Sequence, residues 1–293
     1  MTDLSRALAA AIDPFAAQVY FAPECHRAYA ALGFGPSPAR AGDVEMPDGA
    51  AYFCSRGSVM GQVTGEVVAA TFGVFNPAVV VPAVSYGWTL TDAKTICAAR
   101  TEGATQQLRR ILGASPDGLN RAVELLHRAT EPLQVAGRPL FAGLLAQGLP
   151  GEPLADAWRL ADRLREFRGD AHISAWTIAG FDATEIGLIS ELYRGMPPRS
   201  YIRTRAWSEE QLDGAEERLA ARGLIRDGVL TDAGRAAREA VEVATGEGCA
   251  AIVAGLGDDL DELVGLVGGW SQKVVAAGGY PGARQDMASL TKG

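Results

Sequence analysis

Residues Trp207–Glu242 read WSEEQLDGAEERLAARGLIRDGVLTDAGRAAREAVE, and this stretch decides the fold. Ser208 is a good helix cap, and Gln211 three positions later completes the pattern of a capping box. Apolar residues then recur at the spacing of one helical face, at Leu212, Ala215 and Leu219. Because Gly223 provides a left-handed stop, the pattern predicts a helix over residues 208–222.

A short hairpin and another helix follow in the sequence. The pair Asp227-Gly228 is a two-residue turn signal between short apolar runs. Thr231 then opens a helix that we expect from Asp232 to about Ala244. A helix, a small wing and a second helix in this order resemble the MarR-type winged-helix proteins. In those proteins the helix before the wing lies in the major groove of DNA.

The helix before the wing carries the wrong charge for this role. It has five acids and two arginines, namely Glu209, Glu210, Asp213, Glu216, Glu217, Arg218 and Arg222. Phosphates repel such a surface, so we expect a DNA-binding fold that no longer reads DNA. Four arginines precede the helix with no acid among them, at Arg194, Arg199, Arg203 and Arg205. They either grip phosphates, pair with the acids of the next helix, or bind a substrate carboxylate.

The bulk composition is that of an ordinary globular protein. The 293 residues carry a formal charge of −8, so no global positive field recruits nucleic acid or anionic lipid. The first residues do not resemble a signal peptide, and the apolar stretches are far shorter than the roughly 20 residues of a membrane span. Four widely spaced cysteines predict reduced, mostly buried thiols. We therefore expect a cytoplasmic protein without a membrane partner.

Helical spacing and capping signals along the chain predict a mainly α fold, and one of these signals is a capping box of Asp182 with Glu185 that starts a helix to Tyr193. We expect a multi-helix N-terminal half followed by a C-terminal winged helix-turn-helix with a small two-stranded wing. The predicted parts are a helical domain with a ligand pocket (residues 1–180), a MarR-like winged-helix domain (181–248), and C-terminal helices with a loose tail (249–293). Asp13-Pro14 ends the first predicted helix, and Arg168-Gly169 ends the one that starts at Pro153. Residues 35–48 predict a loop without periodicity.

The sharpest polar cluster lies at Arg165–His172. Gly169 lets the chain turn, and Asp170 is placed to cap the helix that follows. In the first turn of that helix, His172 would lie near the positive end of the dipole, which lowers its pKa and favours the neutral, basic form. Either His172 is a general acid or base oriented by Asp170, or Asp170 is only a cap and His172 satisfies buried carbonyl groups.

Other polar residues in apolar surroundings complete the predicted site. Glu66, in the first turn of an apolar helix, is either a favourable helix-end charge or a second catalytic acid. Arg168 and Arg138 are candidates to stabilise an anion. The remaining predicted ligand-binding residues are Arg56, Tyr20, Phe72 and Asn76. Aromatic residues in this set are equally consistent with core packing.

Cofactor signals are missing from the sequence. The three histidines are scattered, the cysteines lack the spacing of metal ligands, and neither a dinucleotide-binding glycine motif nor a P-loop occurs. We expect no metal and no cofactor.

Several segments together resemble an actinobacterial family of helical proteins with a C-terminal MarR-like winged helix-turn-helix. They are Tyr20–Glu24, Thr64–Phe72, Gly137–Phe141, Arg165–His172, and the Arg-Gly-Leu and Leu-Thr-x-x-Gly pieces beside the wing. The resemblance spans roughly residues 4–245. It implies the fold and brings no established reaction with it.

Three functions remain open from the sequence. The leading hypothesis is a small-molecule-binding protein, specifically a cofactor-independent acid–base enzyme of the cyclase, isomerase or lyase type with an apolar, secondary-metabolite substrate. The alternative is a ligand-responsive MarR-like transcription regulator, for which a homodimer is the expected assembly. The third is a binding or sequestering protein without catalysis, in which the polar cluster is architectural.

Overall fold

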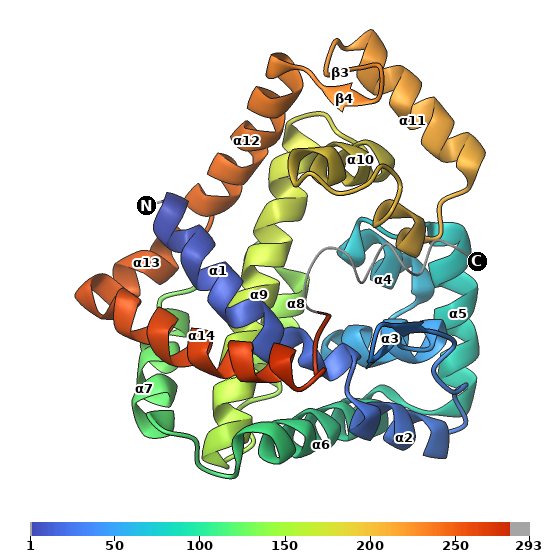
Figure 1. The fold of residues 1–293 in the computed structure, drawn as a ribbon. Helices are drawn as coiled ribbons and strands as arrows, with labels where there is room; N and C mark the ends of the chain where they lie inside the picture. Colours follow the sequence, from blue (N-terminus) through green and yellow to red (C-terminus); the bar gives the residue numbers. More distant parts are fainter. Residues whose placement is uncertain (1, 282–293) are drawn as a thin grey trace.

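The computed structural model describes residues 2–281, and its architecture is mainly α, as predicted (Figure 1). The first part of the chain contains α1 (Thr2–Ala17), η1 (Gln18–Tyr20), α2 (Pro23–Ala31), β1 (Arg40–Ala41), β2 (Val44–Glu45), α3 (Gly49–Gly57), η2 (Ser58–Met60), α4 (Gly65–Phe72), α5 (Pro77–Leu90), α6 (Ala93–Leu112), α7 (Leu119–Thr130), α8 (Pro139–Ala146) and α9 (Pro153–Ile178). The small antiparallel pair β1–β2 lies within residues 35–48, where the sequence predicts only an irregular loop.

The remaining elements continue the helical architecture. They are α10 (Ala183–Tyr193), η3 (Ile202–Arg205), α11 (Glu209–Ala221), β3 (Ile225–Arg226), β4 (Val229–Leu230), α12 (Asp232–Glu247), α13 (Ala250–Leu256), η4 (Gly257–Asp259) and α14 (Leu260–Ala276). Of the predicted loose tail, residues 282–293 lie outside the described residues.

Helix α9 runs through the middle of the molecule, and its continuity corrects the predicted break at Arg168-Gly169 (Figure 1). A glycine inside a helix costs only about 1 kcal/mol. Phe167 and Ala171 are buried in the main core on either side of the break, and Arg168 pairs with Glu242 of α12. Packing on both sides therefore outweighs the weak local signal.

Helix α1 also continues through a predicted stop, at Asp13-Pro14. The hydroxyl of Ser271 on α14 accepts from the Phe15 backbone N–H at 3.1 Å and donates to the Ala11 carbonyl at 2.5 Å. A side chain inserted into the ladder in this way satisfies the backbone groups that a proline kink disturbs. The helix thus survives because of a partner that lies far away in the sequence.

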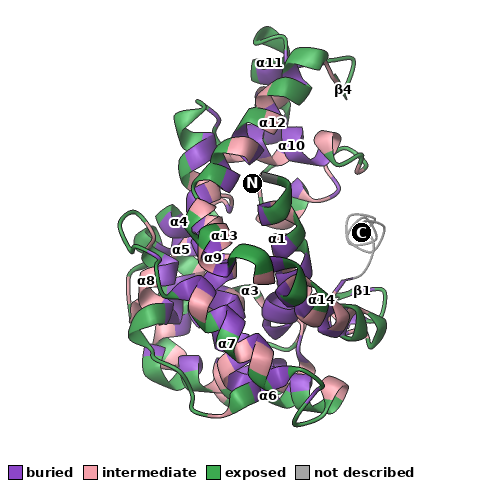
Figure 2. Ribbon diagram, turned by 90° about the vertical axis from the view of Figure 1, so that its left-hand side faces the viewer, coloured by how far each residue is buried: buried purple, intermediate pink, exposed green. Residues whose placement is uncertain are grey.

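Buried apolar side chains form two separate clusters. The larger combines residues between Leu8 and Ala171 with Cys249–Val274, so α13 and α14 pack back onto the first part of the chain. The smaller joins the end of α9 to α10, α11 and α12, from Ala175 to Val241. In Figure 2, buried residues line the inner faces of the body, whereas α11 and β4 project away from it with many exposed residues. Helix α9 contributes to both clusters.

The smaller cluster has the element order of a winged helix, α10–α11–β3–β4–α12. The predicted capping boxes are confirmed at Ser208 with Gln211 and at Asp182 with Glu185. Asp227 and Gly228 both have positive φ, as a two-residue hairpin turn of this kind requires. Thr231 caps α12 by accepting from the backbone N–H of Gly234.

The acids of α11 are drawn to arginines of the preceding segment. Arg199 forms ion pairs with Glu209 at 2.8 Å, Asp213 at 2.7 Å and Glu216 at 2.9 Å. Arg203 adds a second pair with Glu209 at 2.9 Å. Arg199 and Arg203 therefore form ion pairs with the acids of α11, which was one of the alternatives open from the sequence.

Among residues 2–281 no single helix is long and apolar enough to cross a membrane; only the bent pair of residues 232–247 and 250–276, which meet at 49°, reaches that length and composition together. All four cysteines are buried free thiols, as predicted.

Candidate functional site: an arginine-rich cavity

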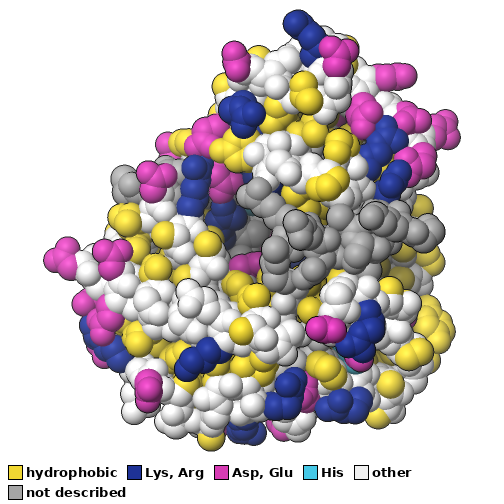
Figure 3. Space-filling view, viewed as in Figure 1, with side chains coloured by type: hydrophobic (Ala, Val, Ile, Leu, Met, Phe, Trp, Pro, Cys, Tyr) yellow, Lys and Arg dark blue, Asp and Glu magenta, His cyan; other side chains and the backbone are white. Residues whose placement is uncertain are grey.

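A cavity of about 870 Å³ lies between the body and the winged-helix part of the chain. Its walls come from α1, α3 and α9 on one side, and from residues 193–205 and α12 on the other. Figure 3 shows this face of the molecule hollowed near its centre, with Lys or Arg side chains at the edge of the hollow.

Positive charge dominates the lining of this cavity. Its acids are Asp13, Glu166 and Glu242, whereas its arginines are Arg6, Arg56, Arg165, Arg168, Arg194, Arg205 and Arg238. Five tyrosines and three phenylalanines also line it. The whole chain has a formal charge of −8, so the cavity is a local exception that favours anions.

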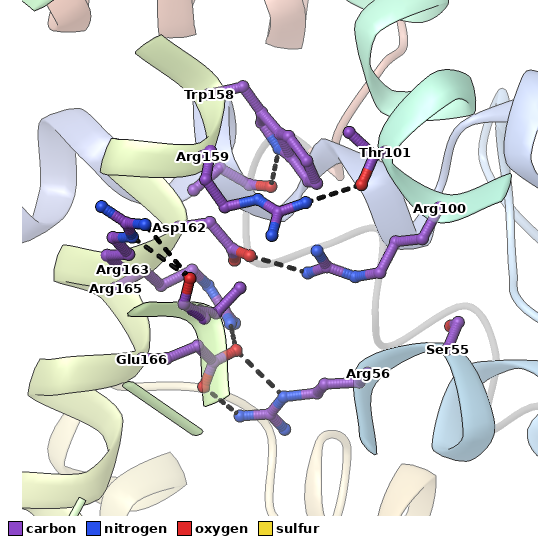
Figure 4. Close-up of polar contacts among 12 residues, drawn as sticks. Ser55, Arg56, Arg100, Thr101, Trp158, Arg159, Asp162, Arg163, Arg165 and Glu166 are labelled. Carbon is purple, nitrogen blue, oxygen red and sulfur yellow. Dashed lines mark hydrogen bonds and ion pairs between the residues drawn. The ribbon is translucent and has the colours of Figure 1, made fainter. Parts of the chain in front are cut away.

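The floor of the cavity is organised around Glu166 of α9 (Figure 4). Arg56 donates to both carboxylate oxygens, with Nε–Oε1 at 3.0 Å and Nη2–Oε2 at 2.7 Å. Arg165 donates to the same carboxylate at 2.7 Å, and the Tyr20 hydroxyl donates at 3.3 Å. Burial alone would raise the pKa of Glu166, but the charges of Arg56 and Arg165 lower it to about 2. Glu166 is therefore an ionised anchor for these arginines.

A second buried ion pair lies behind the floor, one helical turn earlier on α9. Arg100 Nη2 is 3.0 Å from Asp162 Oδ2, and both side chains are almost completely buried (Figure 4). Arg100 also donates to the Tyr20 hydroxyl at 3.3 Å, which connects this pair to the cavity floor. Arg56 and Tyr20, two of the predicted ligand-binding residues, thus lie where a ligand can touch them.

His172 lines the cavity from the last third of α9. Its Nδ1 lies 3.0 Å from the Thr245 hydroxyl, which itself donates to the Val241 carbonyl at 2.7 Å. The hydroxyl has one proton, so it must accept from Nδ1–H, and the lone pair of His172 is on Nε2. Burial and the charges of Arg238 and Arg168 lower the pKa of His172 to about 3. The predicted direction is right, but its cause is not a helix N-terminus.

Asp170 occupies a different place from the one predicted. It lies inside α9 and does not cap it, and the hydrogen bond of its carboxylate goes to Phe141 instead of His172. Its Oδ2 accepts from the backbone N–H of Phe141 at 3.2 Å, in the first turn of α8. Thr245 has the orienting role that we expected for Asp170.

Two further predicted residues lie outside the cavity lining. Arg138 donates to the carbonyl groups of Phe167 at 2.6 Å and Gly248 at 2.8 Å, so it ties α9 to the end of α12. Glu66 is exposed in the first turn of α4, where backbone and Thr64 hydrogen bonds lower its pKa. The structure gives Glu66 the helix-end environment that was the alternative to catalysis.

Phe72 and Asn76 lie outside the cavity lining, and each contacts an arginine that lines it, Arg56 and Arg205 respectively. Phe72 packs beneath the Arg56 guanidinium, whose carbon lies 4.3 Å from the ring centre. Asn76 caps α5 and donates its side-chain amide to the Ala206 carbonyl at 2.9 Å. Arg168, by contrast, lines the cavity and pairs with Glu242.

Most of the wall contributed by residues 193–205 and α12 is not predicted from the sequence. Tyr201, Arg205, Arg238 and Glu242 all line the cavity. The acid-free run of arginines was the available signal, but nothing in it separates Arg199 and Arg203, which pair with α11, from Arg205, which faces the cavity.

Comparisons with known proteins complete these observations. Residues 5–281 match the model of a family described as a helix-turn-helix family. Searches of curated proteins and of solved structures gave no match. Within the part of the chain that the structure describes, no three His, Cys, Asp or Glu side chains are grouped as metal ligands.

Proposed function

This chain belongs to a helix-turn-helix family, and from that premise we propose that it is a small-molecule-binding protein whose ligand occupies the cavity between body and winged helix. We further propose that α11 does not read DNA, because its acids outnumber its arginines. A MarR-like origin of the winged helix is part of this proposal.

One observation carries the proposal: the cavity lies where the body of the molecule meets residues 193–205 and α12, and both sides contribute walls. A volume of about 870 Å³ falls within the range of roughly 300–1,000 Å³ that small-molecule sites occupy. Helix and domain junctions are common places for such sites. Arginines and tyrosines of the lining supply polar groups that can orient a ligand, and apolar side chains such as Leu8, Ile12 and Phe75 line the cavity beside them.

Binding is better supported than the acid–base catalysis considered from the sequence. Of the three proposed catalytic residues, His172 alone lines the cavity. A histidine with a pKa of about 3 is neutral at physiological pH but a weak proton acceptor there. An enzyme of the cyclase, isomerase or lyase type would need a stronger base than this environment provides.

Filling the cavity tests the proposal. Ala9 lines the cavity from α1, whereas Ala7 is exposed on the same helix outside the lining. We expect the Ala9→Trp protein to bind the fluorescent probe 8-anilinonaphthalene-1-sulfonate at least about tenfold more weakly than wild type, since the indole occupies the probe's space.

The Ala7→Trp protein is the matched control, because it adds the same indole to the same helix. Its affinity for the probe should equal that of wild type, with circular dichroism confirming that both variants are folded. Equal affinities for the Ala9→Trp and Ala7→Trp proteins would place the probe elsewhere and refute the cavity as the binding site.

The second candidate is a ligand-responsive regulator of the MarR-like type. It is favoured by the family and by the walls that α12 and residues 193–205 contribute to the cavity, since a ligand there contacts the winged helix directly. A ligand that binds one arrangement of the two parts better than another shifts the protein toward it.

Fluorescence anisotropy with duplex DNA from upstream of the protein's own coding sequence separates the two candidates. We expect a dissociation constant weaker than about 10 µM at physiological salt, because α11 is acidic. Replacing the exposed Glu210 and Glu217 with Gln should strengthen non-specific binding and leave probe binding unchanged. Micromolar or tighter wild-type binding with a steep salt dependence would favour the regulator.

A further inference from the structure

Arg205 has an unusual environment among the arginines of the cavity. Its guanidinium carbon lies 4.5 Å from the ring centre of Phe75 and 4.3 Å from that of Tyr201. Both distances are within the range of cation–π contacts. Its Nη2 also donates to the Tyr201 hydroxyl. The planar group is therefore held at the cavity wall by the rings of Phe75 and Tyr201 and by the Tyr201 hydroxyl.

Backbone contacts fix the segment that carries Arg205. The Asn76 N–H donates to the Arg205 carbonyl at 3.0 Å, and the Asn76 side chain donates to the Ala206 carbonyl. The Trp207 indole donates to the Val74 carbonyl at 2.9 Å. These bonds clamp the end of η3 to the turn between α4 and α5, so Arg205 is positioned before any ligand arrives.

Most other arginines of the cavity already have a carboxylate partner. Arg56 and Arg165 pair with Glu166, Arg168 and Arg238 pair with Glu242, and Arg6 pairs with Glu239. Arg205 forms no ion pair with any carboxylate of residues 2–281, and its Nε is buried without a hydrogen-bond partner. Arginine stays protonated, and a partly buried cation without a counterion is unfavourable.

The surroundings of Arg205 add to its positive charge. Burial tends to raise the pKa of Tyr201, but the charges of Arg205 and Arg194 lower it overall. Phe75, Tyr52 and Phe53 pack against one another beside this position, with ring centres 5.1–5.5 Å apart. The cavity thus has a positively charged end at Arg205, and the rings of Phe75, Tyr52 and Phe53 form the wall next to it.

We propose that Arg205 and Tyr201 form the anion-binding end of the cavity, and that the ligand is a flat aromatic or conjugated monocarboxylate. This inference rests on the proposed function and names its ligand class. The fork of an arginine matches a carboxylate in two parallel hydrogen bonds. Among residues 2–281 the Arg205 guanidinium has no carboxylate partner, and its one positive charge matches the one negative charge of a carboxylate. The aromatic wall next to Arg205 provides a surface against which the flat aromatic or conjugated part of the ligand packs.

Isothermal titration of the full chain with three matched probes tests this inference. The probes are 2-naphthoate, the neutral 2-naphthamide and 2-naphthyl phosphate, at pH 7.5. We expect 2-naphthoate to bind at least about tenfold more tightly than either of the others, because a charge-assisted bidentate contact contributes at least that factor. Arg205→Gln should remove the preference and leave the affinity for 2-naphthamide within about threefold of wild type.

Arg226→Gln is the control, since Arg226 is exposed on the wing and outside the cavity lining. Tyr201→Phe, which keeps the ring and removes one hydroxyl, should weaken 2-naphthoate by a smaller factor and tests the site if the Arg205→Gln protein does not fold. Equal wild-type binding of acid and amide, tighter binding of the phosphate, or an acid preference that survives Arg205→Gln would overturn the inference while leaving the cavity as a binding site. Saturable binding of none of the probes would count against the proposed function itself.

Discussion

Replacing Asp162 with alanine is expected to lower the free energy of unfolding by about 3–5 kcal/mol. Asp162 is completely buried, and its partner Arg100 is 1% exposed. Without the carboxylate, the Arg100 guanidinium stays charged inside the body, because arginine does not lose its proton. Arg159, whose Nη2 donates to Thr101 at 2.7 Å, would lose a nearby negative charge as well. Urea denaturation followed by circular dichroism measures the loss.

The matched control replaces both members of the pair. Arg100→Met combined with Asp162→Leu removes both charges and fills similar space, so most of the lost stability should return. Replacing a buried ion pair by apolar residues of similar volume often leaves the stability of a protein unchanged or increases it, since neither charge then has to leave water. A loss below about 1 kcal/mol for Asp162→Ala alone, or a double variant as unstable as the single one, would contradict this account.

Helix α9 connects the buried Arg100–Asp162 pair to the candidate site. Asp162 lies one turn before Glu166, and Tyr20 contacts both Arg100 and Glu166. The buried layer that holds the body together therefore continues into the floor of the cavity. Arg56 and Arg165 are held by Glu166 as part of that layer, which explains why their charges are not free to bind a ligand.

Short-range signals are the part of this fold that the sequence predicts well. The capping boxes at Asp182 and Ser208, the cap at Thr231 and the turn at Asp227-Gly228 each depend on residues three or fewer positions apart. Such contacts form wherever the local pattern occurs, so they are visible without knowledge of the fold. The order of helix, helix, wing and helix follows from them.

Partners that lie far away in the sequence explain the predictions that are wrong. Pro14 does not end α1, because Ser271 from α14 satisfies the disturbed backbone. Gly169 does not end α9, because packing on both sides of the helix outweighs its weak preference. Asp170 does bond the N-terminal turn of a helix, as a capping residue would, but the helix is α8 and not its own. Partners 29 or more positions away leave no local pattern.

The candidate site is predicted only in part for the same reason. Of the predicted residues, Tyr20, Arg56, Arg168 and His172 line the cavity. The polar cluster Arg165–His172 indicates the last two, and Arg56 is a polar residue in an apolar stretch. The opposite wall includes a stretch of arginines in which residues only two positions apart have different partners. Arg203 reaches outward to Glu209, whereas Arg205 turns inward against Phe75. Both arginines belong to the 3-10 helix η3, in which two residues at i and i+2 point in different directions because three residues make one turn.

Asp170 should make the stability of this protein fall as pH rises from about 4 to about 7. Burial raises the pKa of its carboxyl group to about 7, and the negative Glu166 adds to this, although the Phe141 N–H, Arg56 and Arg138 oppose it. In the unfolded chain the group ionises near its ordinary value of about 4. The folded state therefore holds a proton that the unfolded state has released. Stability is fully present below about pH 4 and is lost progressively up to about pH 7.

Asp170→Asn isolates this contribution, because the amide keeps the shape and an acceptor for the Phe141 N–H but does not ionise. We expect the variant to gain about 2–4 kcal/mol relative to wild type between pH 4 and pH 8, the size that such a pKa difference implies. Urea denaturation of both proteins across this range measures the difference, and other titrating groups such as His172 cancel in it. Two stability curves that run parallel from pH 4 to pH 8 would show that the Asp170 carboxyl is ionised in the folded protein throughout. The Phe141 N–H and the arginines would then outweigh burial at this position.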